Sequence, residues 1–390
     1  MSARVEQANA EVLRQCREQL GFEIDEVARK VKSIAAIEAD ELKPTFKQLK
    51  TLSDLYEVPD WVFISDAIPE RFRLTSSPSY RLFKKAGAPL NPKVNKLLIR
   101  VEQLRELVID FQEDQDEQSD PFDPPEWTED VKTMAKRVRE WLELDSGNRR
   151  HWSFDELREK LEQKDVFILM TSKYNGPWKF SVEEDFRGLC IFYGLLPIVV
   201  INDSDNKKAQ SFSLIHELGH LLRRESIFDH KSILDDDKWD RDDEERWCDE
   251  LAEEVLMPYE LVNPNSYRSF NELKDKDIQV LAKEFMVSPY VFCFRLQSLD
   301  LITEDKANKF KRQIKEKSLS QKASGSVPIS RKRHKEALRQ FGSIYTKTVW
   351  QAYYDDELDL LRLGKLFELN KLHYVQEMRK IIPSTITQSG

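Results

Sequence analysis

Residues 211–222, SFSLIHELGHLL, carry the pattern His-Glu-x-x-His at His216, Glu217 and His220. Residues four apart lie one turn apart on the same face of a helix, so both imidazoles can be directed at one point about 2 Å away, the usual zinc–nitrogen distance. Zinc lowers the pKa of a bound water to about 7, and Glu217 is placed to accept its proton. The pattern therefore predicts a zinc site with Glu217 as the catalytic base.

An ordinary helix with two histidines is the alternative, because this five-residue pattern also arises by chance in long charged helices. Two features favour the metal. The flanks FSLI and LGHLL are apolar, as a buried active-site helix requires, and two of the six histidines of the chain fall here. A zinc site of this kind needs a third protein ligand.

The third ligand is sought in EERWCDELAEEVLMP, where Glu245 and Asp249 lie one turn apart on a second helix. Glu245 would complete three ligands and leave one open position, and Asp249 would bind the first histidine and fix its tautomer. Glu244 and Cys248 are competing ligands. Glu244 would point about 100° away from Glu245, and Cys248 fits a small buried apolar residue. A solvated acidic helix face is the alternative to any ligand here.

Composition sets the broad class of the chain. It has 390 residues, 34% of them charged, a net charge of −9 and only 11 glycines, which favours a mainly helical globular protein of two or three domains. This balance is not typical of a nucleic-acid-binding protein. Four cysteines without Cys-x-x-Cys spacing fit a reducing compartment. Without an apolar signal segment or spanning stretch, we expect a cytoplasmic protein that does not enter membranes.

The order of patterns predicts an α+β fold, mainly helical, in four segments. Residues 1–67 read as short helices of a helix-turn-helix bundle, and residues 68–125 as a helical connector and an acidic, proline-rich linker. Residues 126–310 combine helices with three short apolar strands in a zincin-like domain, including a helix-turn-helix-like unit at 276–302. Residues 326–390 form a helical C-terminal segment.

Taken together, QSFSLIHELGHLL and ERWCDELAEEVLMP resemble the ImmA/IrrE family of metallopeptidases, and the resemblance covers roughly residues 150–305. Glu245 falls on the glutamate that is the third metal ligand of that family. Cys248, Asp249 and Leu251 stand where the family has alanine, asparagine and phenylalanine. The resemblance implies Zn²⁺ as the cofactor and a zinc metalloendopeptidase activity.

The N-terminal segment resembles a Cro/repressor-like helix-turn-helix domain of the XRE type, on LRQCREQLGFEIDEVARKV and KPTFKQLKTLSDLYEVPDWVFI. The stretch KSIAAIEADEL is shorter than the usual turn and recognition helix, and its only basic residue is Lys32. A helix that reads the major groove needs Arg, Lys, Asn or Gln at base edges. We therefore interpret this segment as a protein-interaction module. The side chains left for phosphate contact are Lys43, Lys47 and Lys50.

The resemblances imply a site-specific endopeptidase that cleaves a regulatory protein, a repressor or antitoxin-like regulator, and so relieves transcriptional repression. We expect the strand LPIVVIN to bind this substrate as an added strand. The alternative is a transcriptional regulator or antitoxin that binds DNA or protein, whose metallopeptidase-like domain binds a partner without cutting. A mobile-element or toxin–antitoxin setting follows by analogy alone. The sequence leaves the oligomeric state open.

Overall fold

The chain divides into two compact units. One comprises Met1–Asp110 with Asn175–Trp178, and the other Phe111–Tyr174 with Lys179–Gly390. The division falls inside helix α6 (Pro92–Asp114), and the four predicted segments stay a prediction. This computed structural model describes residues 3–73, 92–115, 120–145, 151–174, 176–182, 185–224, 227–228, 243–262, 274–310, 312 and 332–382.

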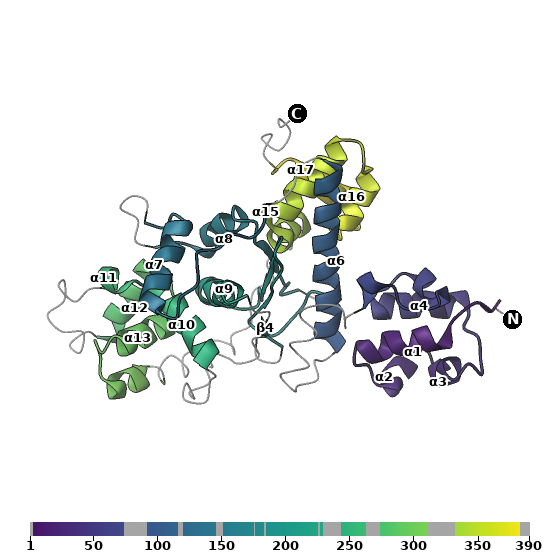
Figure 1. Cartoon of the computed structure of the whole chain (residues 1–390), viewed down its shortest axis with the longest axis horizontal. Helices are drawn as coiled ribbons and strands as arrows, with labels where there is room; N and C mark the ends of the chain where they lie inside the picture. Colours follow the sequence, from purple (N-terminus) through teal and green to yellow (C-terminus); the bar gives the residue numbers. More distant parts are fainter. Residues whose placement is uncertain are drawn as a thin grey trace. The chain divides into compact units, whose positions relative to one another are not determined.

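The first unit is a bundle of short helices (Figure 1). Its helices begin at the capping residues that the sequence offers: Asn9 accepts hydrogen bonds from the backbone of Glu11 and Val12, and Thr45 forms a capping box with Gln48. The elements are α1 (Ala10–Gln19), α2 (Ile24–Ala28), α3 (Ile34–Glu38), α4 (Phe46–Tyr56), and the 3₁₀ turns η1 (Asp60–Ile64) and η2 (Glu70–Phe72).

Helix α3 forms from the stretch in which a helix-turn-helix domain would have its recognition helix, and it has only five residues. Ile34 and Ile37 are buried in the bundle. Glu38 is bound by Arg17, whose Nε lies 2.9 Å from Oε1 of the carboxylate. Among the five residues of this helix, Ala35 is the exposed one. The surface of α3 therefore carries few groups able to hydrogen-bond to a base edge, and the helix-turn-helix assignment stays a prediction.

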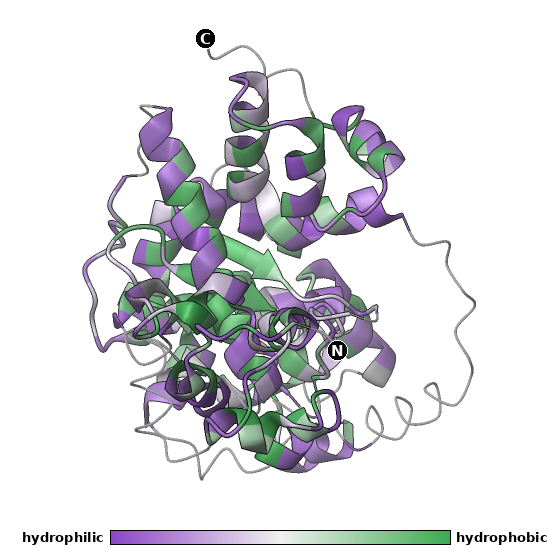
Figure 2. Ribbon diagram, turned by 90° about the vertical axis from the view of Figure 1, so that its right-hand side faces the viewer, coloured by the Kyte–Doolittle hydropathy of each residue, from purple (hydrophilic) through white to green (hydrophobic). Residues whose placement is uncertain are grey.

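A four-stranded sheet in the order β1-β3-β2-β4 lies at the centre of the second unit. Its strands are β1 (Phe167–Met170), β2 (Gly188–Ile191), β3 (Ile198–Ile201) and β4 (Ile227–Phe228). β3 runs parallel to β1 and antiparallel to β2, which pairs antiparallel with β4. Every residue of β1, β2 and β3 is buried, as continuous apolar runs predict, and Figure 2 shows the hydrophobic strands enclosed by helices.

The predicted role of LPIVVIN as a strand that binds substrate is wrong. β3, which forms from this run, is an inner strand: β1 pairs with one of its edges and β2 with the other over all four residues. An added strand needs an edge with unpaired N–H and C=O groups. Composition revealed a buried strand but not its position in the sheet.

Helices pack around this small sheet, so the second unit is mainly helical (Figure 1). The helix with the His-Glu-x-x-His pattern, α9 (Lys207–Leu222), packs against β2 and β3 on one side and against α10 (Asp243–Leu256) on the other. The remaining helices are α7 (Val131–Trp141), α8 (Phe154–Glu162), α11 (Tyr259–Val262), α12 (Asp275–Glu284), α13 (Pro289–Ser298), α15 (Arg333–Tyr354), α16 (Leu360–Leu366) and α17 (Leu372–Arg379).

The predicted C-terminal segment belongs to the second unit, where α15 packs against β1. The N–H groups of Phe167 and Thr171 bind carbonyls of the β3 chain, so the intervening Ile168 directs its carbonyl to the open edge of β1. That carbonyl accepts a hydrogen bond from Arg158, and Gly342 of α15 lies against it. The edge of β1 is thus covered rather than left to pair. Residues 326–331 and 383–390 of this segment lie outside the described residues.

Gly342 allows this packing. It interrupts α15 with φ 76° and ψ −175°, a region that only glycine adopts readily. A Cβ there would overlap the side chains of Glu162 and Arg158 and lie 2.9 Å from the carbonyl oxygen of Ile168.

We therefore expect Gly342→Ala to lower the free energy of unfolding by roughly 2–4 kcal/mol, from backbone strain and overlap together. Denaturant titration would measure it. Gly194→Ala is the matched control, because a Cβ at Gly194 would meet nothing within 4 Å. Equal stability of the two variants would contradict this account of α15.

Candidate metal centre

Helix α9 places polar side chains in an apolar environment. Asn206 caps it by accepting from the backbone N–H groups of Lys208 and Ala209. Every residue from Ala209 to Leu222 is buried, including His216, Glu217 and His220. Buried polar groups require partners, so these three side chains must be satisfied by neighbours or by a ligand.

The second helix, α10, approaches α9 closely where Gly219 faces Cys248. A Cβ at Gly219 would lie 2.9 Å from Sγ of Cys248, so the absence of a side chain permits the contact. This approach brings α10 within hydrogen-bonding reach of both histidines. The C-terminal end of α10 is held by two arginines, because Arg139 donates to the carbonyl of Val255 and Arg295 to that of Met257.

His216, His220 and Glu245 converge on one point. Nε2 of His216 lies 3.2 Å from Nε2 of His220 and 3.2 Å from Oε2 of Glu245, and Nε2 of His220 lies 3.5 Å from Oε1 of Glu245. One ligand atom from each residue lies within 4.8 Å of the others. Two imidazole nitrogens and one carboxylate form a donor set that suits zinc and leaves a coordination position open. The residues present therefore fit a metal ion.

Asp249 and Cys248 contact the other nitrogens of the two rings. Oδ1 of Asp249 lies 3.0 Å from Nδ1 of His216, and Sγ of Cys248 lies 3.5 Å from Nδ1 of His220. Such contacts fix the ring orientation and direct Nε2 at the cluster. Burial raises the pKa of the Cys248 thiol well above its usual value, so the sulfur stays protonated. The structure thus places Cys248 beside the cluster and not in it.

Glu244, the other competing ligand, points elsewhere. Its Oε1 lies 3.2 Å from Nη2 of Arg223, which follows α9. Arg223 also lies beside Trp127 and Trp247, which contact each other, with its guanidinium carbon 5.5 and 5.7 Å from the two ring centroids. Trp127 lies two residues after the predicted connector and acidic linker, and sequence reasoning gave it no role. Its signal was faint: an aromatic residue after a proline-rich stretch.

The side chain of Glu217 points toward strand β2 of the sheet. A Cβ at Gly188, the first residue of β2, would overlap Oε1 of Glu217 and lie 2.9 Å from its Cγ and Cδ. The carboxyl group is buried together with the rest of the side chain. Gly188 therefore leaves the space that Glu217 occupies, and sequence reasoning missed it because a glycine before a strand has many ordinary explanations.

The electrostatics of the cluster favour a positive charge at its centre. Burial alone would lower the pKa of His216, but hydrogen bonds to Asp249 and Glu245, and attraction to both carboxylates, hold that pKa well above its usual value. In the metal-free protein the His216 ring is therefore protonated on both nitrogens, and positively charged, at neutral pH. A divalent cation would replace this proton and satisfy the same carboxylates.

The lysines predicted for phosphate contact lie in the first unit and differ in their surroundings. Nζ of Lys43 donates to the carbonyl of Ala8 at 3.1 Å and pairs with Asp40. Lys47 and Lys50 lie exposed on α4. The structure does not bring a base-reading side chain of α3 beside them, so nucleic-acid contact stays a prediction.

Helices α9 and α10 thus bring together a His-His-Glu group that could hold a metal ion. Residues 181–297, which hold all three members of the cluster, match the family model described as Peptidase_M78, the IrrE N-terminal-like domain. The match supports the resemblance to the ImmA/IrrE family and a metallopeptidase-type function. It does not include residues 1–67. No curated protein and no solved structure matches the chain.

We expect Glu245→Ala to weaken zinc binding by at least about 100-fold, because it removes a carboxylate that lies near both Nε2 atoms. Glu244→Ala is the matched control on the same helix and should leave the affinity within a few-fold, since Glu244 binds Arg223. Competition with a zinc chelator would measure both. The reverse order would move the third ligand to Glu244.

Zinc binding should release protons. Because the pKa of His216 is raised, the metal-free protein holds a proton there above pH 6.5, and the affinity for zinc should fall as the pH is lowered, by up to about tenfold per pH unit for one proton. Calorimetry in buffers of different ionisation enthalpy would count the protons released. A pH-independent affinity between pH 6 and 8 would contradict the charge assigned to His216.

Proposed function

We propose that the chain is a zinc-dependent, site-specific endopeptidase. The observation that carries the proposal is the convergence of His216, His220 and Glu245, with Glu217 one residue along the same helix. The family match over residues 181–297 supports the same class of activity. A purely structural metal would usually be closed by a fourth protein ligand, and the described residues of the cluster number three.

The ligands would be Nε2 of the two histidines and the carboxylate of Glu245. Asp249 would accept from Nδ1–H of His216 and hold its ring in the ligating tautomer. Glu245 keeps 22% of its side chain exposed whereas His220 is fully buried, so solvent reaches the cluster from the Glu245 side. A zinc ion held by these residues would supply a Lewis acid to polarise the scissile carbonyl and activate water.

Glu217 would be the proton carrier of the reaction. Its carboxylate accepts a proton from the attacking water as the new C–O bond forms. It then gives this proton to the amide nitrogen as the C–N bond breaks, so that an amine leaves. The space above Gly188 holds the carboxylate in one place, which is what a proton acceptor needs within hydrogen-bond reach of both partners.

We propose a repressor or antitoxin-like regulator as the substrate, with relief of transcriptional repression as the result of cleavage, and the cytoplasm as the location. The resemblance to the ImmA/IrrE family supports this substrate class, and the N-terminal helical unit supports recognition of a protein. No helix among the described residues is both long and apolar enough to cross a membrane.

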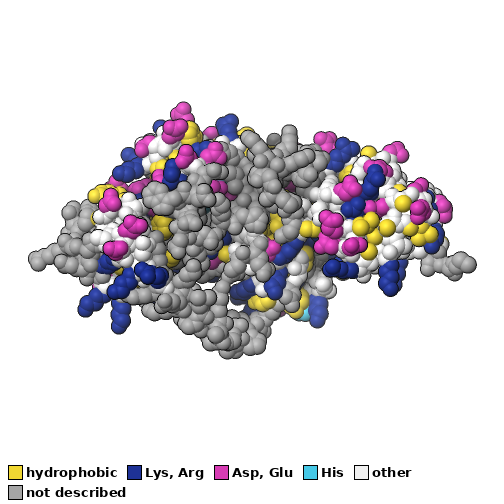
Figure 3. Space-filling view, turned by 90° about the horizontal axis from the view of Figure 1, so that it is seen from below, with side chains coloured by type: hydrophobic (Ala, Val, Ile, Leu, Met, Phe, Trp, Pro, Cys, Tyr) yellow, Lys and Arg dark blue, Asp and Glu magenta, His cyan; other side chains and the backbone are white. Residues whose placement is uncertain are grey.

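The second candidate is a regulator or antitoxin that binds a protein without cutting it. Its supporting observation is the surface of the first unit, where Phe46, Trp61 and Ile64 are exposed. On the face in Figure 3, hydrophobic side chains of this unit lie among mixed acidic and basic ones. Such a surface suits a protein partner better than a phosphate backbone. A module that only binds has no chemical need for Glu217.

Glu217→Gln should keep zinc and lower cleavage by a factor on the order of 100 or more, because the amide fits the space but cannot accept the proton. A proteome-wide comparison of protein N-termini, in cells expressing wild type or the variant, would test it. The expected result is a new N-terminus inside a regulator with wild type only. Glu244→Gln is the matched control and should cut as wild type does.

Cleavage by Glu217→Gln at the wild-type rate would remove the catalytic assignment. No new N-terminus with wild type, while zinc is bound in both proteins, would favour the binding module.

A further inference from the structure

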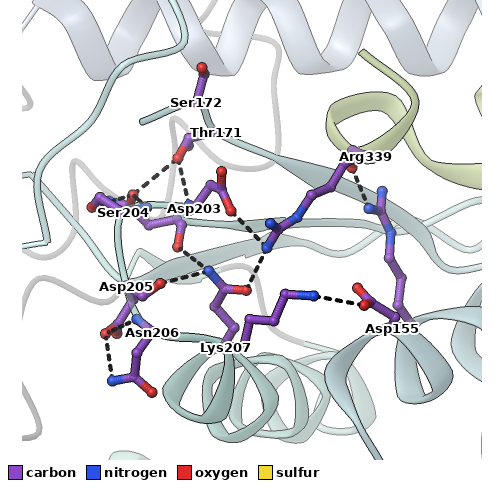
Figure 4. Close-up of polar contacts among 12 residues, drawn as sticks. Asp155, Thr171, Ser172, Asp203, Ser204, Asp205, Asn206, Lys207 and Arg339 are labelled. Carbon is purple, nitrogen blue, oxygen red and sulfur yellow. Dashed lines mark hydrogen bonds and ion pairs between the residues drawn. The ribbon is translucent and has the colours of Figure 1, made fainter. Parts of the chain in front are cut away.

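Arg339 of α15 binds side chains at the start of α9, the helix with His216 and His220 (Figure 4). Its Nη2 lies 2.7 Å from Oδ1 of Asp203 and donates to Oε1 of Gln210 at 3.0 Å. Asp203 lies in the turn just before α9, and Gln210 is in the first turn of α9. One guanidinium from the C-terminal helices thus holds two points at the amino end of α9.

The pair with Asp203 is not an ordinary surface ion pair. The Asp203 side chain is only 10% exposed, and its backbone N–H donates to Oγ1 of Thr171 at the end of β1. Burial raises the pKa of this carboxyl group, and Arg339 is the strongest influence that opposes the rise. Loss of Arg339 would leave a buried carboxylate without its closest positive charge, which is costly.

Gln210 links the contacts of Arg339 to the helix face that carries Glu217. The two residues are seven apart, so they lie on the same face of α9, about 10.5 Å apart along its axis. Nε2 of Gln210 donates to the carbonyl of Asp205 at 2.9 Å and lies 3.5 Å from that of Asn202. Nδ2 of Asn202 donates to the carbonyl of Phe186 at 2.7 Å. Phe186 is two residues before Gly188.

A series of hydrogen bonds therefore connects α15 to the two elements that meet at Glu217, which are α9 and β2. One branch enters α9 at Gln210, and the other reaches the chain leading into β2. Arg339 cannot slide along the sheet, because its own carbonyl accepts from Arg158 and the backbone N–H of Ser343 donates to Glu162 at 3.1 Å. Arg158 and Glu162 belong to α8, which also packs on α9.

We propose that Arg339 is a positioning residue of the candidate metal centre. By binding Gln210 and Asp203 it sets how α9 lies on β2 and β3, and so where the carboxylate of Glu217 lies relative to the metal ligands. The C-terminal helices are then a part of the catalytic framework and not an appendage. The inference rests on the role proposed for Glu217, but its test needs no substrate.

The test compares three variants of the full-length protein: Arg339→Gln, Arg339→Lys and, as the matched control, Lys335→Gln, which removes an exposed charge from the same helix. Hydrogen exchange is followed at the amides of residues 210–220, with α13 as the reference for global opening. Arg339→Gln should raise exchange in α9 about tenfold or more relative to α13, as loss of a charged hydrogen bond predicts. Arg339→Lys should restore part of the protection.

The second readout is the visible absorption spectrum of the protein loaded with Co²⁺, which responds to groups beside the metal. Gly188→Ala, which displaces Glu217 directly, provides the reference shift. Arg339→Gln should shift the spectrum in the same direction while Co²⁺ stays bound, and Lys335→Gln should not. Parallel rises in exchange throughout the second unit with an unshifted spectrum would overturn the proposal, because Arg339 would then contribute stability alone.

The two proposals fail in different ways. If Glu217→Gln and wild type cut nothing in cells, the exchange and spectral results still decide the role of Arg339. If Glu217→Gln abolishes cleavage but Arg339→Gln leaves the Co²⁺ spectrum and the exchange of α9 unchanged, the peptidase proposal stands and the positioning role falls.

Discussion

The close approach of α9 and α10 is the constraint on which the rest of the second unit depends. Histidine and glutamate side chains inside an apolar core are tolerated only when they find partners, and α10 provides these for both histidines. The approach requires the missing side chain of Gly219. Two arginines, Arg139 and Arg295, then fix the far end of α10. The cluster is thus a consequence of helix packing, and the packing is supported by buried ionic contacts.

Much of this site could be predicted because its spacing is local. Residues at i and i+4 share a helix face, so the pairs His216–His220 and Glu245–Asp249 follow from the sequence once both helices are assumed. The rotation of about 100° between neighbours likewise separates Glu245 from Glu244. The structure brings His216, His220 and Glu245 together, with Asp249 against the first histidine. The spacing on the second helix already favoured Glu245 as the third ligand, and the resemblance to a family agreed with that choice.

The rest could not be predicted, because it depends on contacts between distant parts of the chain. The run LPIVVIN shows an apolar strand, but not that the strand lies between two others, and the substrate role assigned to it was wrong. Gly188 and Gly342 act through what faces them, Glu217 in one case and Arg158 with Glu162 in the other. Periodicity along one element contains no information on its neighbours across the fold.

These distant contacts change how the C-terminal helices are understood. The sequence predicted a separate helical C-terminal segment, yet Arg339 binds at the start of α9 and Gly342 lies on the edge of β1. Without these two contacts the fold would contain a buried carboxylate with no counter-ion and a strand edge open to pairing, and both are unfavourable. An element that removes two such costs at once is part of the fold. Because one of them lies at the amino end of the helix with Glu217, the stability of this packing and the geometry of the candidate centre depend on the same residues.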